Sequence, residues 1–112
     1  MHSSSKLRYN LLEFIGSLEK IELYCKDFVN ADYFYHDQKS FDASMMQFVV
    51  IGEIIFRLDT EYKVKHPHIP WQKIKDFRNI IAHGYFGIDA DEVWDIIQNK
   101  PLPLRKEIQQ LL

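Results

Sequence analysis

A long stripe of apolar residues at helical spacing is the feature that most limits what this chain can fold into. Near the N-terminus, apolar side chains recur at alternating steps of four and three residues: Leu7, Leu11, Phe14, Leu18, Ile21, Cys25 and Phe28. This period places them all on one face of an α-helix. A half-buried strand would require alternation at every second residue, and we find no segment with that pattern. The sequence therefore predicts an all-α protein.

A second helix is predicted over residues 41–59, and it is apolar around most of its circumference. One stripe of this helix contains Phe41, Met45, Phe48, Gly52 and Ile55, and further apolar residues cover most of the remaining surface. A helix of this kind must be covered on nearly all sides. We expect it at the centre of a bundle or at a contact between two copies of the chain, which favours a homodimer. Ser40 or Asp42 is available as its N-cap.

Three further helices are indicated by their start and stop signals. Pro70 suits the first turn of a helix over residues 70–83, and Gly84 follows as a natural stop. Asp89 and Glu92 form a capping-box pattern that starts a fourth helix, which ends before Pro101. A short C-terminal helix is expected over residues 103–112. The predicted fold is an up-and-down bundle of about four main helices plus this short helix.

Composition fits one soluble globular domain covering residues 1–112. The chain is 46% apolar and 27% charged, which is too apolar for disorder and too charged for a membrane bundle. The longest apolar stretch, residues 45–58, is shorter than the ~20 residues that cross a bilayer. No separate apolar segment follows the N-terminus, so we expect no signal peptide and a cytoplasmic location. A single cysteine, Cys25, predicts neither a disulfide nor a thiolate metal site.

Charge is distributed unevenly along the chain. The formal net charge is −2, yet residues 61–84 contain five Lys or Arg and two acidic residues, so this segment is basic and the rest is acidic. A basic segment on an acidic protein is where an anionic partner would approach. A solvent-exposed helix face could have the same excess of basic residues, and composition alone leaves both interpretations open.

The chemically most informative residues lie at the end of the third predicted helix. Asn79 and His83 are i,i+4 neighbours, so the amide can reach the imidazole, while the long side chain of Arg78 can reach a phosphate held near His83. These groups suit cleavage of RNA without a metal: an imidazole moves a proton to or from a ribose oxygen, and a guanidinium stabilises charge on the phosphate. The alternative is structural, with Arg78 paired to a carboxylate such as Glu53 and His83 satisfying a helix end.

Other candidate sites have simpler interpretations. His66 and His68 could ligate a metal, but no further ligand completes the set at suitable spacing, and we predict no metal or other cofactor. The aromatic run over residues 33–35 could stack on bases, although anchoring a loop on the core is the commoner use. Tyr85 could extend an apolar stripe into the core.

Several motifs together resemble one family. The segment from Arg78 to Tyr85 has the form R-X4-H-X-Y, which is similar to the motif of HEPN domains in their HepT-like branch. Ile51-Gly52-Glu53 resembles the I-G-E of the second helix in that branch, and residues 66–71 resemble its H-P-X-I-P-W segment. The sequence that follows, with Gly84 to Asp89 and then Val93-Trp94, is also similar. The resemblance covers most of the chain.

The resemblance implies a HEPN-type helical bundle, usually a homodimer whose two motifs face one another across a cleft. It implies a ribonuclease toxin beside a small MNT-type nucleotidyltransferase antitoxin, with Arg78 and His83 as the catalytic pair and Asn79 as a supporting polar residue. It also implies that the antitoxin blocks Tyr85 by adding AMP. Two rivals remain: a non-catalytic binding partner of a nucleotidyltransferase with the same fold, and a generic interaction protein.

Overall fold

The computed structural model describes residues 2–112, and its ordered elements within this range are all helical. The elements are α1 (His2–Cys25), α2 (Ala31–His36), α3 (Gln38–Arg57), α4 (Thr60–Lys65), α5 (Trp71–Gly84), the 3-10 helix η1 (Tyr85–Gly87), α6 (Ala90–Asn99) and α7 (Pro101–Gln109). No strand occurs in residues 2–112. The predicted all-α bundle is confirmed.

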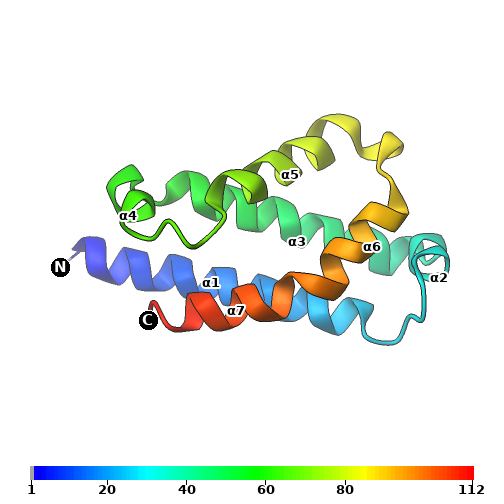
Figure 1. Cartoon of the computed structure of the whole chain (residues 1–112), viewed down its shortest axis with the longest axis horizontal. Helices are drawn as coiled ribbons and strands as arrows, with labels where there is room; N and C mark the ends of the chain where they lie inside the picture. The colour runs from blue at the N-terminus through cyan, green and yellow to red at the C-terminus, as the bar shows by residue number, and fades with distance from the viewer. Residues whose placement is uncertain (1) are drawn as a thin grey trace.

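The long helices run side by side along the molecule (Figure 1). α3 packs against α1 on one side and against α5 on the other, and α7 runs back along α1. α2 and α6 pack together at one end of the bundle, and α4 lies at the opposite end. α5 runs antiparallel to α3, so the end of α5 reaches the part of the molecule where α3 begins.

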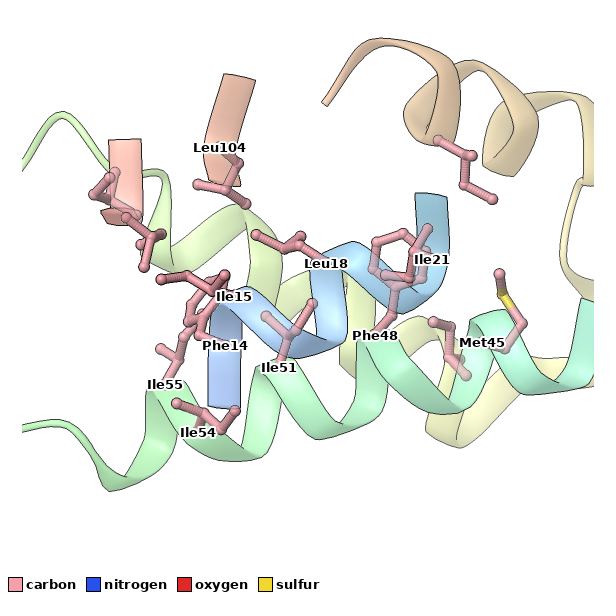
Figure 2. Close-up of a cluster of buried hydrophobic side chains, with 14 of the residues drawn as sticks. Phe14, Ile15, Leu18, Ile21, Met45, Phe48, Ile51, Ile54, Ile55 and Leu104 are labelled. Atoms are coloured by element: carbon pink, nitrogen blue, oxygen red, sulfur yellow. The ribbon is translucent and has the colours of Figure 1, made fainter. Parts of the chain in front are cut away.

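The core forms where the apolar stripe of α1 meets α3. Figure 2 shows Phe14, Leu18 and Ile21 of α1 facing the apolar residues of α3, with Leu104 of α7 on the other side of α1. Phe14 and Ile21 are fully buried, as is Ile54 of α3. Cys25 is buried as well, which its place on the predicted stripe explains. The helical period of the sequence therefore identified the buried face of α1 correctly.

α3 is the central helix, as its apolar sequence predicted, but it is not covered on every side. Met46 is 57% exposed and Phe56 is 52% exposed, whereas eight residues of the helix are buried. Phe56 lies beside Lys75 and Arg78 of α5, and both uncovered side chains leave apolar surface on α3. No helix of residues 2–112 combines the length and the apolar character needed to cross a membrane.

The structure corrects several helix boundaries. α3 begins at Gln38, and its cap is Asp37, whose Oδ1 accepts a hydrogen bond of 3.1 Å from the Ser40 amide; the predicted caps Ser40 and Asp42 are wrong. α7 begins at Pro101 and not at residue 103, because proline is tolerated in the first turn of a helix. The cap predicted at Asp89 is confirmed, since its carboxylate accepts from the backbone of Asp91 and Glu92.

Two short helices, α2 and α4, lie outside the segments for which the sequence predicts helices. α2 begins at the cap Asn30 and buries Phe34 completely. The Phe34 ring packs against the rings of Phe28, Phe41 and Trp94 with centroids 5.4–5.6 Å apart. Within the aromatic run over residues 33–35, Phe34 therefore anchors this segment to the core, whereas Tyr33 is exposed.

Candidate active site on α5

α5 carries the candidate catalytic residues, and its first turn is fixed by Trp71. The indole Nε1 of Trp71 donates to the backbone carbonyls of Lys63 and His66, at 3.1 and 3.0 Å, while the ring is buried. Further along, the rings of Phe77 and Phe48 meet edge to face with centroids 4.9 Å apart. The Trp71 hydrogen bonds tie the start of α5 to α4 and the connection that follows it, and the Phe77–Phe48 contact holds α5 against α3.

Arg78 crosses α3 at Gly52. A Cβ atom added to Gly52 would lie 2.6 Å from the Arg78 Cβ and closer still to its Cγ, so any larger residue at position 52 would displace the arginine. The absence of a side chain at Gly52 therefore allows the close approach of the two helices. A glycine inside a strongly apolar helical pattern is the sequence signal for such an approach.

The guanidinium of Arg78 is held by two polar side chains. Its Nη2 donates to the carboxylate of Glu53 on α3, and its Nη1 donates to Oδ1 of Asn79 at 3.1 Å. The Arg78 side chain is 22% exposed, and its buried Nε has no partner among the described residues. The pairing with Glu53 that the sequence allowed as a structural alternative is present, and it leaves part of the guanidinium accessible.

His83 lies in the last turn of α5 and is exposed to solvent. The imidazole makes no hydrogen bond to any side chain or backbone group of residues 5–112. The expected contact between Asn79 and His83 is therefore wrong, because the Asn79 carbonyl oxygen is engaged by Arg78 instead. An exposed imidazole without an internal partner is free to exchange a proton with a bound ligand.

Arg78 and His83 project in different directions from the helix. Five residues correspond to a rotation of about 140° and a rise of about 7.5 Å at ordinary helical geometry. A phosphate that contacts both groups of one chain must therefore lie in the solvent-exposed sector between them. The same angle allows His83 to face a group on a second molecule.

Tyr85 follows α5 in η1 and returns to the first turns of α3. Its hydroxyl donates a hydrogen bond to the carboxylate of Asp42, and its ring packs on Phe41 with centroids 6.0 Å apart. Burial raises the pKa of Tyr85 above its usual range, and the hydrogen bond to Asp42 and the negative charge of that carboxylate raise it further. Sequence analysis missed Asp42 as the partner of Tyr85, because 43 residues separate them and only the antiparallel packing of α3 and α5 brings them together.

His66 and His68 lie in the connection between α4 and α5, and His66 packs against an aromatic side chain of α4. The His66 ring packs against the ring of Tyr62 with centroids 4.5 Å apart, and the His66 and His68 rings are 6.0 Å apart. In the part of the chain that the structure describes, no group of three or more His, Cys, Asp or Glu side chains is placed to hold a metal ion.

Comparisons with known proteins show to which family the chain belongs. The family model described as ribonuclease HepT-like matches residues 14–111. A Methanocaldococcus jannaschii protein named "Gamma-glutamylcyclotransferase and putative RNase" is 33% identical over 88% of this chain, although the match spans only 44% of that protein. A second protein of that organism, named "Putative RNase", is 35% identical over 77% of this chain and 74% of its own length.

A Thermococcus cleftensis protein named "Probable ribonuclease HepT" is 27% identical over 85% of this chain and 86% of its own length. No solved structure gives a significant match. The family match covers nearly the whole chain, including α5 with Arg78 and His83 and the η1 residue Tyr85. The chain belongs to the ribonuclease HepT-like family.

Proposed function

We propose that this protein is a metal-independent endoribonuclease in which Arg78 and His83 act on the scissile phosphate. The observation that carries the proposal is the pairing, on one helix of a ribonuclease HepT-like chain, of an anchored guanidinium with an exposed imidazole that has no internal partner. Names given to the relatives include RNase and ribonuclease, in accord with this chemistry.

RNA supplies its own nucleophile in the proposed reaction. A neutral His83 imidazole accepts the proton of the ribose 2′-OH, the 2′ oxygen bonds to phosphorus, and the bond from phosphorus to the 5′ oxygen breaks. The leaving 5′ oxygen takes a proton from a protonated imidazole. Arg78 stabilises the negative charge that builds up on the phosphate oxygens. The products are a 2′,3′-cyclic phosphate and a 5′-OH end.

Asn79 supports the reaction by holding Arg78 through the 3.1 Å hydrogen bond from Nη1. Glu53 holds the other terminal nitrogen, so an incoming phosphate exchanges with this carboxylate for the guanidinium. Before RNA binds, the hydrogen bonds to Glu53 and Asn79 keep the Arg78 guanidinium in a fixed orientation.

The test is an RNA digestion in EDTA with the chemical form of the new ends identified. We expect cyclic-phosphate and 5′-OH ends with the unaltered protein, and a loss of at least 100-fold in cleavage rate for His83→Ala and Arg78→Ala. His68→Ala removes an exposed imidazole from a neighbouring segment and serves as the matched control, with unchanged cleavage. Equal activity of His83→Ala and the control would reject the assignment.

We further propose that the active unit is a homodimer. The reaction needs a proton acceptor and a proton donor, each chain offers one exposed imidazole in this region, and the divergence of Arg78 and His83 suits a site completed by a second chain. Exposed apolar side chains on α3 and α5, including Met46 and Ile80, provide surface for the contact. Adding an excess of the inactive His83→Ala protein to the unaltered protein is expected to lower the activity, because mixed dimers retain only one His83 imidazole, and unchanged activity would argue for independent sites.

The proposed partner is an MNT-type nucleotidyltransferase antitoxin that adds AMP to Tyr85. In this transfer the phenol oxygen bonds to the α-phosphorus of ATP, pyrophosphate leaves, and the phenol proton passes to a base; Asp42 already accepts a hydrogen bond from that hydroxyl. The added nucleotide would place a bulky anion near Arg78 and His83. A mass increase of one AMP in the protein co-produced with such an enzyme, absent in Tyr85→Phe, is the expected result.

The Arg78–Glu53 pair favours a second candidate function. A bundle whose arginine remains neutralised by Glu53 could serve as a non-catalytic binding partner of a nucleotidyltransferase. This alternative predicts that the protein forms a complex with the enzyme, that no RNA is cleaved in the digestion above, and that His83→Ala behaves as the unaltered protein does.

A further inference from the structure

An exposed aromatic ring lies close to two cations on the surface formed by α3 and α5. The ring belongs to Phe56, which is 52% exposed near the end of α3. The Nζ of Lys75 lies 5.1 Å from the centroid of this ring, and the Cζ of Arg78 lies 5.9 Å from it. Because Lys75 and Arg78 are one helical turn apart on α5, their charges follow one edge of the same exposed surface.

A third cation, Lys63 of α4, extends this row away from Arg78. Its Nζ donates a hydrogen bond of 3.0 Å to the carbonyl of Ile55, the residue before Phe56. Burial lowers the pKa of Lys63, and repulsion by the positive charge of Lys75 lowers it further, in keeping with two ammonium groups that lie near one another.

Neither Lys63 nor Lys75 forms a salt bridge with a carboxylate among the side chains of residues 5–112. Like charges that are brought together without a counter-ion attract an anion to the space they share. An exposed aromatic ring beside such a group is the arrangement with which proteins bind single-stranded nucleic acid, where cations contact phosphates and rings stack on bases.

We propose that Phe56, Lys63 and Lys75 form a binding subsite for a nucleotide of single-stranded RNA that flanks the bond cleaved at Arg78. Lys75 and Lys63 contact a neighbouring phosphate, and the exposed part of the Phe56 ring contacts a base. The proposal rests on the ribonuclease function proposed above and gives its substrate a direction: the strand leaves Arg78 along α5 toward α4. It also assigns a role to the basic segment over residues 61–84.

The test measures binding separately from cleavage. The probe is a fluorescein-labelled 2′-O-methyl oligouridylate of twelve nucleotides, which lacks the free 2′-OH that cleavage requires, and binding is followed by fluorescence anisotropy over a range of salt concentrations. Lys75→Ala is expected to weaken binding several-fold and to reduce the magnitude of the salt slope by about 0.7, the value for one phosphate contact on a single strand. Phe56→Ala is expected to weaken binding about tenfold with no change in slope.

Two exposed residues elsewhere provide matched controls. Lys106→Ala on α7 removes the same charge, and Tyr9→Ala on α1 removes an aromatic ring that is 60% exposed. Both are expected to bind the probe as the unaltered protein does. Binding that Lys75→Ala and Phe56→Ala leave unchanged would overturn the proposal, as would equal losses in the controls or no binding by the unaltered protein.

The outcomes separate the subsite from the ribonuclease function. Probe binding that depends on Lys75 and Phe56, in a protein that cleaves no RNA, would keep the subsite and reject the catalytic proposal. Cleavage of RNA with probe binding that ignores both residues would keep the catalytic proposal and reject the subsite. Circular dichroism melting of each variant verifies that a loss of binding is not a loss of folding.

Discussion

At the scale of single residues, the position of Arg78 depends on what α3 places opposite it. Gly52 leaves room for the aliphatic part of the side chain, and Glu53 holds one terminal nitrogen. Asn79, the next residue on α5, holds the other terminal nitrogen. The guanidinium is therefore oriented before any ligand binds, which reduces the ordering that binding requires.

Replacing Gly52 with alanine tests this arrangement. The new Cβ would overlap Arg78, so we expect Gly52→Ala to lower the free energy of unfolding by about 1–3 kcal/mol and to displace the arginine. Gly16→Ala on α1 is the control, because nothing lies within 4 Å of its added Cβ, and alanine there should stabilise the helix by about 0.5–1 kcal/mol. Chemical denaturation measures both values, and a stable Gly52→Ala protein would contradict the close approach.

Tyr85 and Asp42 give a pH-dependent test. Since the pKa of Tyr85 is raised in the folded chain, the folded protein keeps the phenol proton at alkaline pH where the unfolded chain releases it, and stability falls as the pH rises above about 10. Asp42→Asn removes the negative charge, and we expect the pKa of Tyr85 to fall while burial still raises it. The difference in phenolate absorbance between the parent protein and its Tyr85→Phe variant gives the titration of Tyr85 alone. If Asp42→Asn leaves the pKa of Tyr85 unchanged, the hydrogen bond between the two side chains is contradicted.

Single-residue roles were predictable where they depend on local spacing. The sequence identified Arg78, His83 and Tyr85 as candidates because they lie within one short motif. It gave Asn79 the wrong neighbour, since i,i+4 spacing allows a contact with His83 but Arg78 offers a charged donor to the same oxygen. It missed the Tyr85–Asp42 contact, which depends on the packing of two helices far apart in sequence.

At the scale of helices, apolar periodicity predicted the elements and their buried faces better than it predicted their ends. The stripe of α1 is buried as expected, and α3 is central. The start of α3 was misplaced because Asp37, Ser40 and Asp42 are all suitable caps by residue type, and only the backbone geometry selects Asp37. α2 and α4 escaped prediction because six residues are too few to show a helical period.

The cap of α3 can be tested directly. Asp37→Ala removes the acceptor of the Ser40 amide, and we expect a loss of about 1 kcal/mol in the free energy of unfolding. Asp59→Ala is the control, because Asp59 precedes α4 and its side chain makes no hydrogen bond to that helix. We expect this substitution to lower the free energy of unfolding by only a few tenths of that value. Urea denaturation compares the two. Equal losses would mean that the contribution is general electrostatics at a helix start and not the cap.

At the scale of the whole molecule, the bundle is closed by the packing of α7 along α1. Arg105 of α7 donates to both carboxylate oxygens of Glu22 on α1, at 2.8 and 3.3 Å, across 83 residues of sequence. The buried residues Leu104 and Ile108 lie on the same helix and add apolar contact to the core. These contacts join the last helix of the chain to the first, and the candidate catalytic residues lie on α5, outside this pair of helices.

The Arg105–Glu22 pair contributes to this closure in a measurable way. The two side chains are 22% and 30% exposed, so their interaction is only partly screened by solvent. We expect Arg105→Met to lower the free energy of unfolding by about 1 kcal/mol or more. A double-mutant cycle with Glu22→Gln should return a coupling energy of about 0.5–1 kcal/mol, and additive effects of the two substitutions would show that the pair adds no stability.

The ribonuclease proposal is tested most directly by removing one 2′-OH from the RNA. A bond that the protein cuts in EDTA is located in an all-ribose RNA, and the same RNA is prepared with a single 2′-deoxynucleotide on the 5′ side of that bond. We expect cleavage at this bond to disappear while other bonds are still cut, because the 2′ oxygen is the nucleophile. Continued cleavage at the substituted bond, or no cleavage of the all-ribose RNA, would contradict the proposed chemistry of Arg78 and His83.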